Sequence, residues 1–241
     1  MLKNLSLFLM AYNEEKNIEK AIADSLDAAK KVAHNYEVIV VLYGGSTDRT
    51  REIVERIASH NKKVRLVIQK LDNKGYGAGL RTGIRSSRYD YIFYTDADNQ
   101  FDMNDLKKLI PYLKHYDIVQ GRRTDRKDSM LRIIAAKIYN LGLKIMFGDY
   151  GVNDVDCAFK VYKKRIFDKI KIKCNSGVGD AEIIIKAKRL GYRIKEVPIR
   201  HKPRTKGDTV YASKIGMIKL GVIKGILKDV RKLWNDIYKA I

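Results

Sequence analysis

Two aspartates stand two residues apart where an apolar run gives way to polar sequence. Residues 91–95 are followed directly by Asp96, Asp98 and Gln100, with one residue between successive members. Side chains two apart in an extended segment point the same way, so both carboxylates can address one ligand. Their hard oxygens suit Mg²⁺ or Mn²⁺, which would bridge a diphosphate. The alternative is an Asx turn or a helix cap before residues 103–113.

The composition indicates one globular domain with anionic partners. The chain has 241 residues, 45% of them hydrophobic, which is enough to bury one core. Its 49 lysines and arginines against 28 acidic residues give a net charge of +21, which favours phosphates, nucleic acid or anionic lipid. Cys157 and Cys174 are too few for a disulfide framework or a zinc site, which suits a reducing compartment. With neither a signal-peptide pattern nor a run of about 18 apolar residues, we expect a soluble or peripheral protein.

Alternating apolar runs and helical periods predict an α/β fold in which a parallel sheet is covered by helices. We expect strands at residues 6–10, 37–42, 64–69, 91–95, 117–120 and 193–198. We expect helices at residues 17–33, 48–58, 78–85, 131–147 and 180–190. Ligands of such sheets bind beyond the carboxyl ends of the strands, so the loops after Met10, Leu42 and Thr95 are the candidate site.

The C-terminal segment predicts a basic amphipathic helix. From Ala212 onward, aliphatic residues recur every three or four positions. Residues 211–241 contain seven lysines or arginines against two aspartates, a net charge of +5. Such a helix suits an anionic membrane surface. The alternative is that its apolar stripe packs on the rest of the protein or on a second subunit.

Three spaced motifs resemble family 2 glycosyltransferases: residues 11–15 (AYNEE), 45–48 (GSTD) and 95–101 (TDADNQF). Later segments are similar to the dolichyl-phosphate mannose synthase-like branch, notably residues 121–123 and 154–160. The resemblance implies a GT-A catalytic domain over residues 1–210, followed by the helix at 211–241. It also implies a Mg²⁺- or Mn²⁺-dependent, inverting transfer from a nucleotide sugar, of GDP-mannose or UDP-glucose type, to a polyprenyl phosphate. We therefore expect peripheral attachment to the cytoplasmic face of the cell membrane.

The same resemblance assigns the donor-side roles. Tyr12 and Glu14 would contact the nucleotide, and Asp96 would contact the donor. Asp98 would bind the metal, and Gln100 would bind the metal or the diphosphate.

The resemblance assigns cationic roles as well. Arg123 and Arg132 would hold the acceptor phosphate, whereas Arg204 and Lys206 would close over the donor diphosphate. A solvated surface charge is the alternative for each arginine. The arginines stand in loops with glycines and carboxylates, unlike nucleic-acid-binding patterns, so we expect no nucleic acid partner.

The sequence departs from the family pattern at two places. Met10 stands where members usually carry proline, and Tyr43 and Gly44 replace an acidic pair. Since an acidic side chain there ordinarily helps to read the nucleobase, the departure leaves the donor nucleotide open.

Two further features have open alternatives. Asp180 and Glu182 would serve as a base if the acceptor were a sugar hydroxyl, or would simply favour a helix N-terminus. The glycine-rich residues 73–79 indicate a close backbone approach to the donor site or an ordinary turn. A glycosyltransferase acting on a sugar hydroxyl is the second hypothesis, and a noncatalytic anion-binding module is the third.

Overall fold

The structure, a computed structural model, describes residues 1–124, 130–204 and 220–239. Within this part of the chain, seven strands form one sheet in the order β3-β2-β1-β4-β6-β5-β7. Of the described strands, only β6 runs against its neighbours. The strands are β1 (Leu2–Ala11), β2 (Ala33–Tyr43), β3 (Val64–Gln69), β4 (Tyr91–Asp96), β5 (Ile118–Thr124), β6 (Phe159–Lys163) and β7 (Ile194–Arg200).

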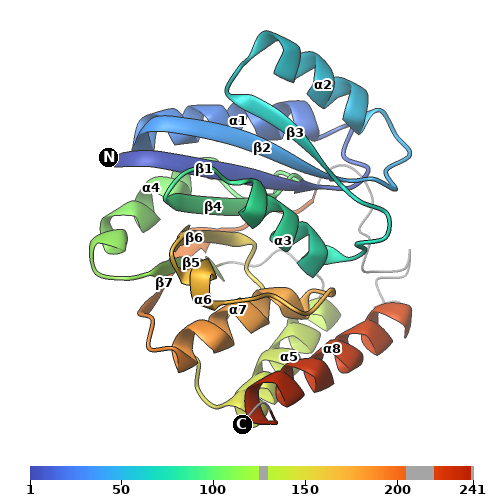
Figure 1. Cartoon of the computed structure of the whole chain (residues 1–241), viewed down its shortest axis with the longest axis vertical. Helices are drawn as coiled ribbons and strands as arrows, with labels where there is room; N and C mark the ends of the chain where they lie inside the picture. Colours follow the sequence, from blue (N-terminus) through green and yellow to red (C-terminus); the bar gives the residue numbers. More distant parts are fainter. Residues whose placement is uncertain (125–129, 205–219, 240–241) are drawn as a thin grey trace.

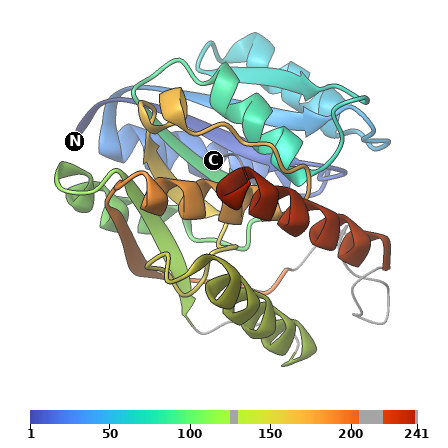
Figure 2. The same cartoon turned by 60° about the horizontal axis from the view of Figure 1, so that its bottom comes forward.

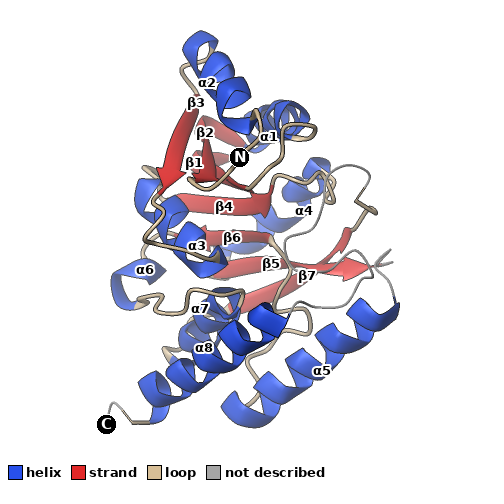
Figure 3. Cartoon of the chain, turned by 90° about the vertical axis from the view of Figure 1, so that its right-hand side faces the viewer, coloured by secondary structure: helices blue, strands red, loops and turns tan. Residues whose placement is uncertain are grey.

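Helices cover both faces of this sheet (Figure 3), with α1 and α4 on one face and α3 and α7 on the other. The helices are α1 (Ile18–Val32), α2 (Thr50–His60), α3 (Tyr76–Ser86), α4 (Leu106–Leu109), α5 (Met130–Phe147), α6 (Ile166–Lys169), α7 (Val178–Arg189) and α8 (Leu220–Tyr238). Two 3₁₀ turns, Met103–Asp105 and Ile110–Lys114, flank α4. In Figure 1, α5 and α8 lie together at the end of the molecule opposite α2.

The central strands are apolar on both faces, as a sheet covered by helices requires. In β1, for example, Leu7, Phe8 and Leu9 are all buried. The covering helix α1 buries one side only, with residues such as Ile18, Ile22 and Ala29 recurring at helical spacing. The predicted mostly parallel sheet flanked by helices is therefore confirmed.

The strand β6 was not predicted, although it lies in the middle of the sheet between β4 and β5. Its sequence, Phe-Lys-Val-Tyr-Lys, places Lys160 at a completely buried position. A lysine rarely occupies such a position without a partner. The partner is Asp180, whose Oδ1 lies 2.8 Å from the ammonium nitrogen, and only the folded chain reveals that pairing.

The C-terminal helix is confirmed as α8, but its apolar stripe turns toward the protein. Leu233 is buried, and Ile226, Val230 and Ile237 pack against the core. The packing alternative therefore holds for this part of the stripe. The predicted helix start at Ala212 and the boundary at residues 210–211 lie outside the described residues.

Candidate active site

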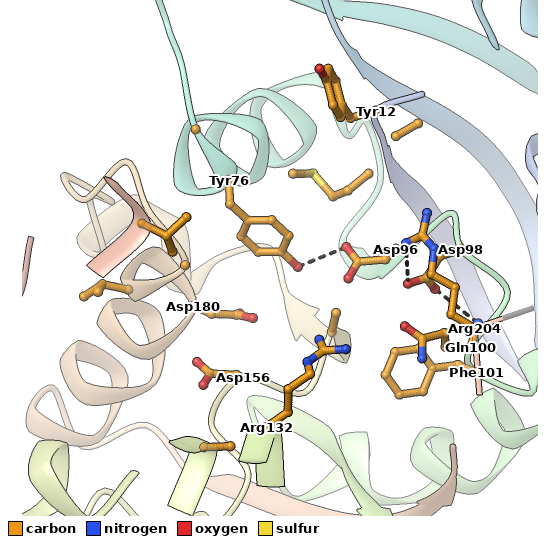
Figure 4. Close-up of a pocket in the computed structure, with 18 of the residues that line it drawn as sticks. Tyr12, Tyr76, Asp96, Asp98, Gln100, Phe101, Arg132, Asp156, Asp180 and Arg204 are labelled. Atoms are coloured by element: carbon orange, nitrogen blue, oxygen red, sulfur yellow. Dashed lines mark hydrogen bonds and ion pairs between the residues drawn. The ribbon is translucent and has the colours of Figure 1, made fainter. Parts of the chain in front are cut away.

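A cavity of about 700 Å³ lies at the carboxyl ends of the parallel strands (Figure 4). It brings together most of the residues predicted from the sequence. Those that line it are Tyr12, Glu14, Asp96, Asp98, Gln100, Arg123, Arg132, Asp180 and Arg204. Glu182 is not among the lining residues, and Lys206 lies outside the described part of the chain.

Two sequence motifs hold each other in place at one rim of the cavity. Asn13 adopts a left-handed conformation with φ of 52°, which ends β1 and turns the chain. The backbone N–H of Thr47 donates to Asn13 Oδ1 at 2.8 Å. The backbone N–H of Glu14 donates to Thr50 Oγ1 at 2.8 Å. These bonds position Tyr12 and Glu14 at the cavity.

The carboxylates of Asp96 and Asp98 crowd negative charge at the end of β4. Burial, and then the charge of Asp98, hold the pKa of Asp96 well above its usual value. Burial also raises the pKa of Asp98, although the Gln100 amide and Arg204 oppose the shift. The Gln100 N–H donates to Asp98 Oδ1 at 3.1 Å, so the Asx-turn alternative is present too. A cation near these groups would favour their charged forms.

Arg204 neutralises part of this charge in the structure. Its Nη2 lies 2.6 Å from Glu14 Oε1, and its Nη1 lies 3.5 Å from Asp98 Oδ2. The segment that carries it is attached to the loop after β4, because the Lys202 N–H donates to the Gln100 carbonyl at 2.7 Å. Arg204 therefore links Glu14, in the loop after β1, to Asp98, in the loop after β4.

The two arginines predicted to hold an acceptor phosphate have different environments. Arg123 makes a bidentate pair with Asp154, with distances of 2.8 Å from Nε to Oδ2 and 2.6 Å from Nη2 to Oδ1. Arg132, on α5, projects into the cavity near Asp156 (Figure 4). Both arginines line the cavity, and Asp154 orients the guanidinium of Arg123.

Asp180 contributes to the cavity wall as part of a buried polar cluster. It pairs with Lys160 and accepts a hydrogen bond from the Tyr94 hydroxyl. The Lys160 ammonium also donates to the Val155 carbonyl at 2.9 Å. The cluster holds β4, β6 and α7 together at the base of the site.

Glu182, the other predicted base, holds two segments of the backbone together. Its side chain is completely buried, and it accepts hydrogen bonds from the backbone N–H groups of Lys173 and Cys174. Lys186 Nζ also lies 2.5 Å from its Oε1. The carboxylate ties α7 to the preceding loop, so its geometry gives no support to a role as base.

Two cavity residues were not singled out from the sequence. Asp156 has its pKa raised to about 7, mainly by burial and then by the charge of Asp180, against the opposing effect of Arg123 and Lys160. Tyr139 presents a buried hydroxyl with no hydrogen-bond partner among the described residues. A signal existed for Tyr139, since it lies seven residues after Arg132, on the same side of the predicted helix.

The far end of the cavity is aromatic. The rings of Tyr12 and Tyr43 lie 5.6 Å apart between centroids. Gln69 lies beside them, and its amide donates to the carbonyls of Asn73 and Gly75 at 2.6 and 3.0 Å. The position of the family's acidic pair is thus occupied by an aromatic ring.

The glycine-rich segment brings two backbones together. A Cβ on Gly77 would stand 2.3 Å from the Cys174 carbonyl oxygen, and Gly75 has φ of 98°. The Gly77 N–H donates to the Asn175 carbonyl at 2.9 Å. The close approach predicted for this segment is therefore to the loop before α7, although Gly75 also lines the cavity.

Comparisons with known proteins identify the family of the chain. The family model described as Glycosyl transferase family 2 matches residues 6–171. Glycosyltransferase AglD of Haloferax volcanii is 29% identical over 95% of this chain and 37% of its own length. An undecaprenyl-phosphate 4-deoxy-4-formamido-L-arabinose transferase of Pectobacterium atrosepticum is 28% identical, over 88% of this chain and 63% of its own. Dolichyl-phosphate beta-glucosyltransferase ALG5A of Trichomonas vaginalis is 28% identical, over 81% and 64%. The chain thus spans less than two thirds of each relative.

Solved structures identify the fold. Glucosyl-3-phosphoglycerate synthase from Mycobacterium tuberculosis, in complex with Mn²⁺, UDP-glucose and glycerol 3-phosphate, superposes with a TM-score of 0.67. The two sequences are 19% identical, and the match covers 94% of this chain and 79% of the synthase chain. Its complex with UDP gives the same TM-score. The GT-A fold expected from the sequence is confirmed.

In the described part of the chain, no helix is both long and apolar enough to cross a membrane.

Proposed function

Because the chain belongs to glycosyl transferase family 2, we propose that it transfers a hexose, with inversion, from a nucleotide sugar to a polyprenyl phosphate. The observation that carries the proposal is one cavity that joins the carboxylates of Asp96 and Asp98, at the end of β4, to Arg132, on α5. Relatives named for undecaprenyl-phosphate and dolichyl-phosphate transfer support the acceptor class. Because a polyprenyl phosphate is a membrane lipid, we propose that the transfer takes place at the cytoplasmic face of the cell membrane.

We call the side of the cavity formed by the loops after β1, β2 and β4 the donor wall, and the side formed by β5, α5, α7 and the loop before β6 the acceptor wall. A divalent cation fits the donor wall. Asp98 and Gln100 offer hard oxygen atoms, the ligands that Mg²⁺ and Mn²⁺ prefer. The described residues contain no cluster of three or more histidine, cysteine, aspartate or glutamate side chains that would hold a metal. The diphosphate of the donor would therefore supply further ligands, as is common for Mg²⁺. When bound, the cation would neutralise the departing nucleoside diphosphate.

The side chains of the cavity would position the two substrates and neutralise the charge of their phosphate groups. A phosphate monoester is already an anion near neutral pH, so its oxygen can attack the anomeric carbon without a protein base. The bond between that carbon and the diphosphate oxygen breaks, and the electron pair leaves with the nucleoside diphosphate. Arg132 would orient the incoming phosphate, and Arg204 would exchange its contacts with Glu14 and Asp98 for the diphosphate.

The nucleotide would place its base at the aromatic end of the cavity. Stacking on Tyr12 and Tyr43 tolerates different bases, because every base has a π face. A carboxylate there would select by hydrogen bonding instead. Donors of both GDP-mannose and UDP-glucose type are therefore candidates.

A second candidate function is transfer to a sugar hydroxyl. The observation that favours it is Asp156, whose pKa of about 7 suits a general base. Replacing this carboxyl distinguishes the two functions. Asp156→Asn should retain turnover with a phosphate acceptor, whereas a hydroxyl acceptor should lose about 100-fold or more.

The proposal is tested by incubating the purified protein with Mg²⁺ or Mn²⁺, a short-chain polyprenyl phosphate and a panel of nucleotide sugars. Release of nucleoside diphosphate is followed. We expect release that needs both metal and acceptor, and a loss of about 100-fold or more in Asp98→Ala. The matched control, Asp27→Ala, removes an exposed carboxylate of α1 and should leave turnover unchanged. Nucleotide binding without transfer to any phosphate acceptor would contradict the proposal.

A further inference from the structure

One face of α5 exposes large apolar side chains. Six of them are between 46% and 77% exposed: Met130, Leu131, Ile134, Ile138, Leu141 and Ile145. At 3.6 residues per turn, these positions fall within an arc of roughly 100°. We call this set the outer face of α5. Contiguous apolar surface of this kind marks an interaction site more often than a solvated one.

The opposite side of the same helix belongs to the catalytic cavity. Arg132, Ala135, Ala136 and Tyr139 line the cavity from α5. Around the helix axis, the mean direction of these four residues lies roughly 140° from the mean direction of the outer face. A single helix therefore separates the cavity from the exposed apolar surface.

The charge of α5 is of one sign. Its 18 residues contain Arg132, Lys137 and Lys144 and no acidic side chain. The two lysines lie along one edge of the outer face when the helix is drawn end-on. An apolar face bordered by lysines is the pattern of a helix that lies in an anionic lipid interface.

The neighbouring helix α8 extends this surface. Phe147 at the end of α5 packs against Trp234 and Tyr238 of α8 at centroid distances of 5.9 and 6.3 Å, tilted to the first ring and stacked on the second. On α8, Leu227 is 64% exposed and Ile223 is 39% exposed. Figure 1 shows α5 and α8 at the same end of the molecule, and Figure 2 shows that end turned forward. The stripe that packs inward on α8 is a different one, so α5 presents the larger free apolar surface.

We propose that the outer face of α5 docks the protein on an anionic lipid surface, with Leu227 and Ile223 of α8 as a secondary contact. The proposal rests on the proposed function, because a polyprenyl phosphate presents its charged group at the lipid headgroup level. Docking through α5 brings the inner side of that helix, with Arg132, to the same level. It relocates the membrane contact expected from the C-terminal helix to the middle of the chain.

The test uses vesicles of phosphatidylcholine with phosphatidylglycerol, and vesicles of phosphatidylcholine alone. We expect the wild-type chain to sediment with the anionic vesicles. The double variant Ile138→Gln with Leu141→Gln should bind them about tenfold or more weakly, because it replaces two exposed apolar side chains. The control, Leu71→Gln, removes an apolar side chain that is 57% exposed in the loop after β3 and should bind like the wild type.

Turnover of a water-soluble, short-chain polyprenyl phosphate separates docking from catalysis. The double variant should keep wild-type turnover in solution and lose it with long-chain acceptor in anionic vesicles. Wild-type vesicle binding without turnover of any acceptor would overturn the proposed function and leave docking intact.

Equal vesicle binding by the wild type and the double variant would overturn the docking proposal. So would a wild-type dimer in solution that the double variant dissociates, because the outer face would then be an interface between copies of the chain.

Discussion

The two walls of the cavity are held by different forces. On the donor wall, hydrogen bonds such as that from the Thr47 N–H to Asn13 join short loops after parallel strands, and the ion pair of Arg204 with Glu14 lies at the cavity, where Arg204 is partly exposed. On the acceptor wall, buried ion pairs join β5, β6 and α7, with Arg123 on Asp154 and Lys160 on Asp180. Removing one partner of a buried pair leaves an uncompensated charge, whereas a lost neutral bond can be replaced by water. The comparison indicates that the acceptor wall tolerates single substitutions less well.

Of the substitutions that test this comparison, Lys160→Met is expected to have the largest effect on stability. This substitution leaves Asp180 without its cation in a buried site, so the free energy of unfolding should fall by about 3–5 kcal/mol. Asn13→Ala on the donor wall should cost about 1 kcal/mol. Urea denaturation measures both. Adding Asp180→Leu to Lys160→Met should recover part of the loss, and equal losses on the two walls would break the comparison.

Within the acceptor wall, Arg132 and Arg123 should respond differently. Arg132→Ala should lower kcat/KM for the phosphate acceptor by about 100-fold, roughly 2.7 kcal/mol, with little change in stability. Arg123→Ala should instead destabilise the fold, because Asp154 loses a bidentate partner. Steady-state kinetics and thermal melting separate the two effects. A kinetic loss in Arg123→Ala without loss of stability would reverse the assignment.

Asp156, on the acceptor wall, makes the free energy of unfolding depend on pH. Its pKa is raised from 3.8 to about 7, so the folded protein binds this proton more tightly than the unfolded chain. The resulting contribution favours folding at low pH and is lost as the pH rises toward 7. Asp156→Asn should therefore stabilise the protein by roughly 2.7 kcal/mol more at pH 8 than at pH 5. Denaturation of both proteins at the two pH values measures the difference, and a pH-independent one would be contrary to this expectation.

The smallest effect is expected at the donor wall, from Tyr43→Asp. A carboxylate there can accept a hydrogen bond from a nucleobase, whereas the ring can only stack. The wild type should bind UDP, GDP, CDP and ADP within about tenfold of one another, and the variant should discriminate more sharply. Titration calorimetry in the presence of Mg²⁺ provides the affinities. Strong selection of one base by the wild type would show that other groups read it.

Sequence reasoning predicted the donor half of the fold better than the acceptor half. The strands β1 to β4 carry apolar runs that end in polar loops, and both signals are local. The strand β6 carries Lys160 at a buried position, so it became recognisable only with Asp180 in place. Glu182 shows the same limit, because its sequence position at a helix start could not reveal that backbone amides would surround it.

Helical spacing has a related limit. It predicted α5 and α8 correctly as helices, but it could not tell which face each would cover. The stripe of α8 was predicted as a candidate for lipid contact and packs inward, whereas no lipid contact was predicted for the exposed residues of α5. Which apolar face remains uncovered depends on the neighbouring elements, and these are brought together only by the tertiary fold.

The position of β6 also bears on how the chain acquires its structure during synthesis. Strands β3, β2, β1 and β4 become available by residue 96, yet β4 has an open edge until Phe159–Lys163 emerge and pair with it. An unpaired apolar strand edge is prone to pair with other chains. The N-terminal half should therefore aggregate when produced alone, and the late arrival of one antiparallel strand would protect the nascent protein by closing its sheet.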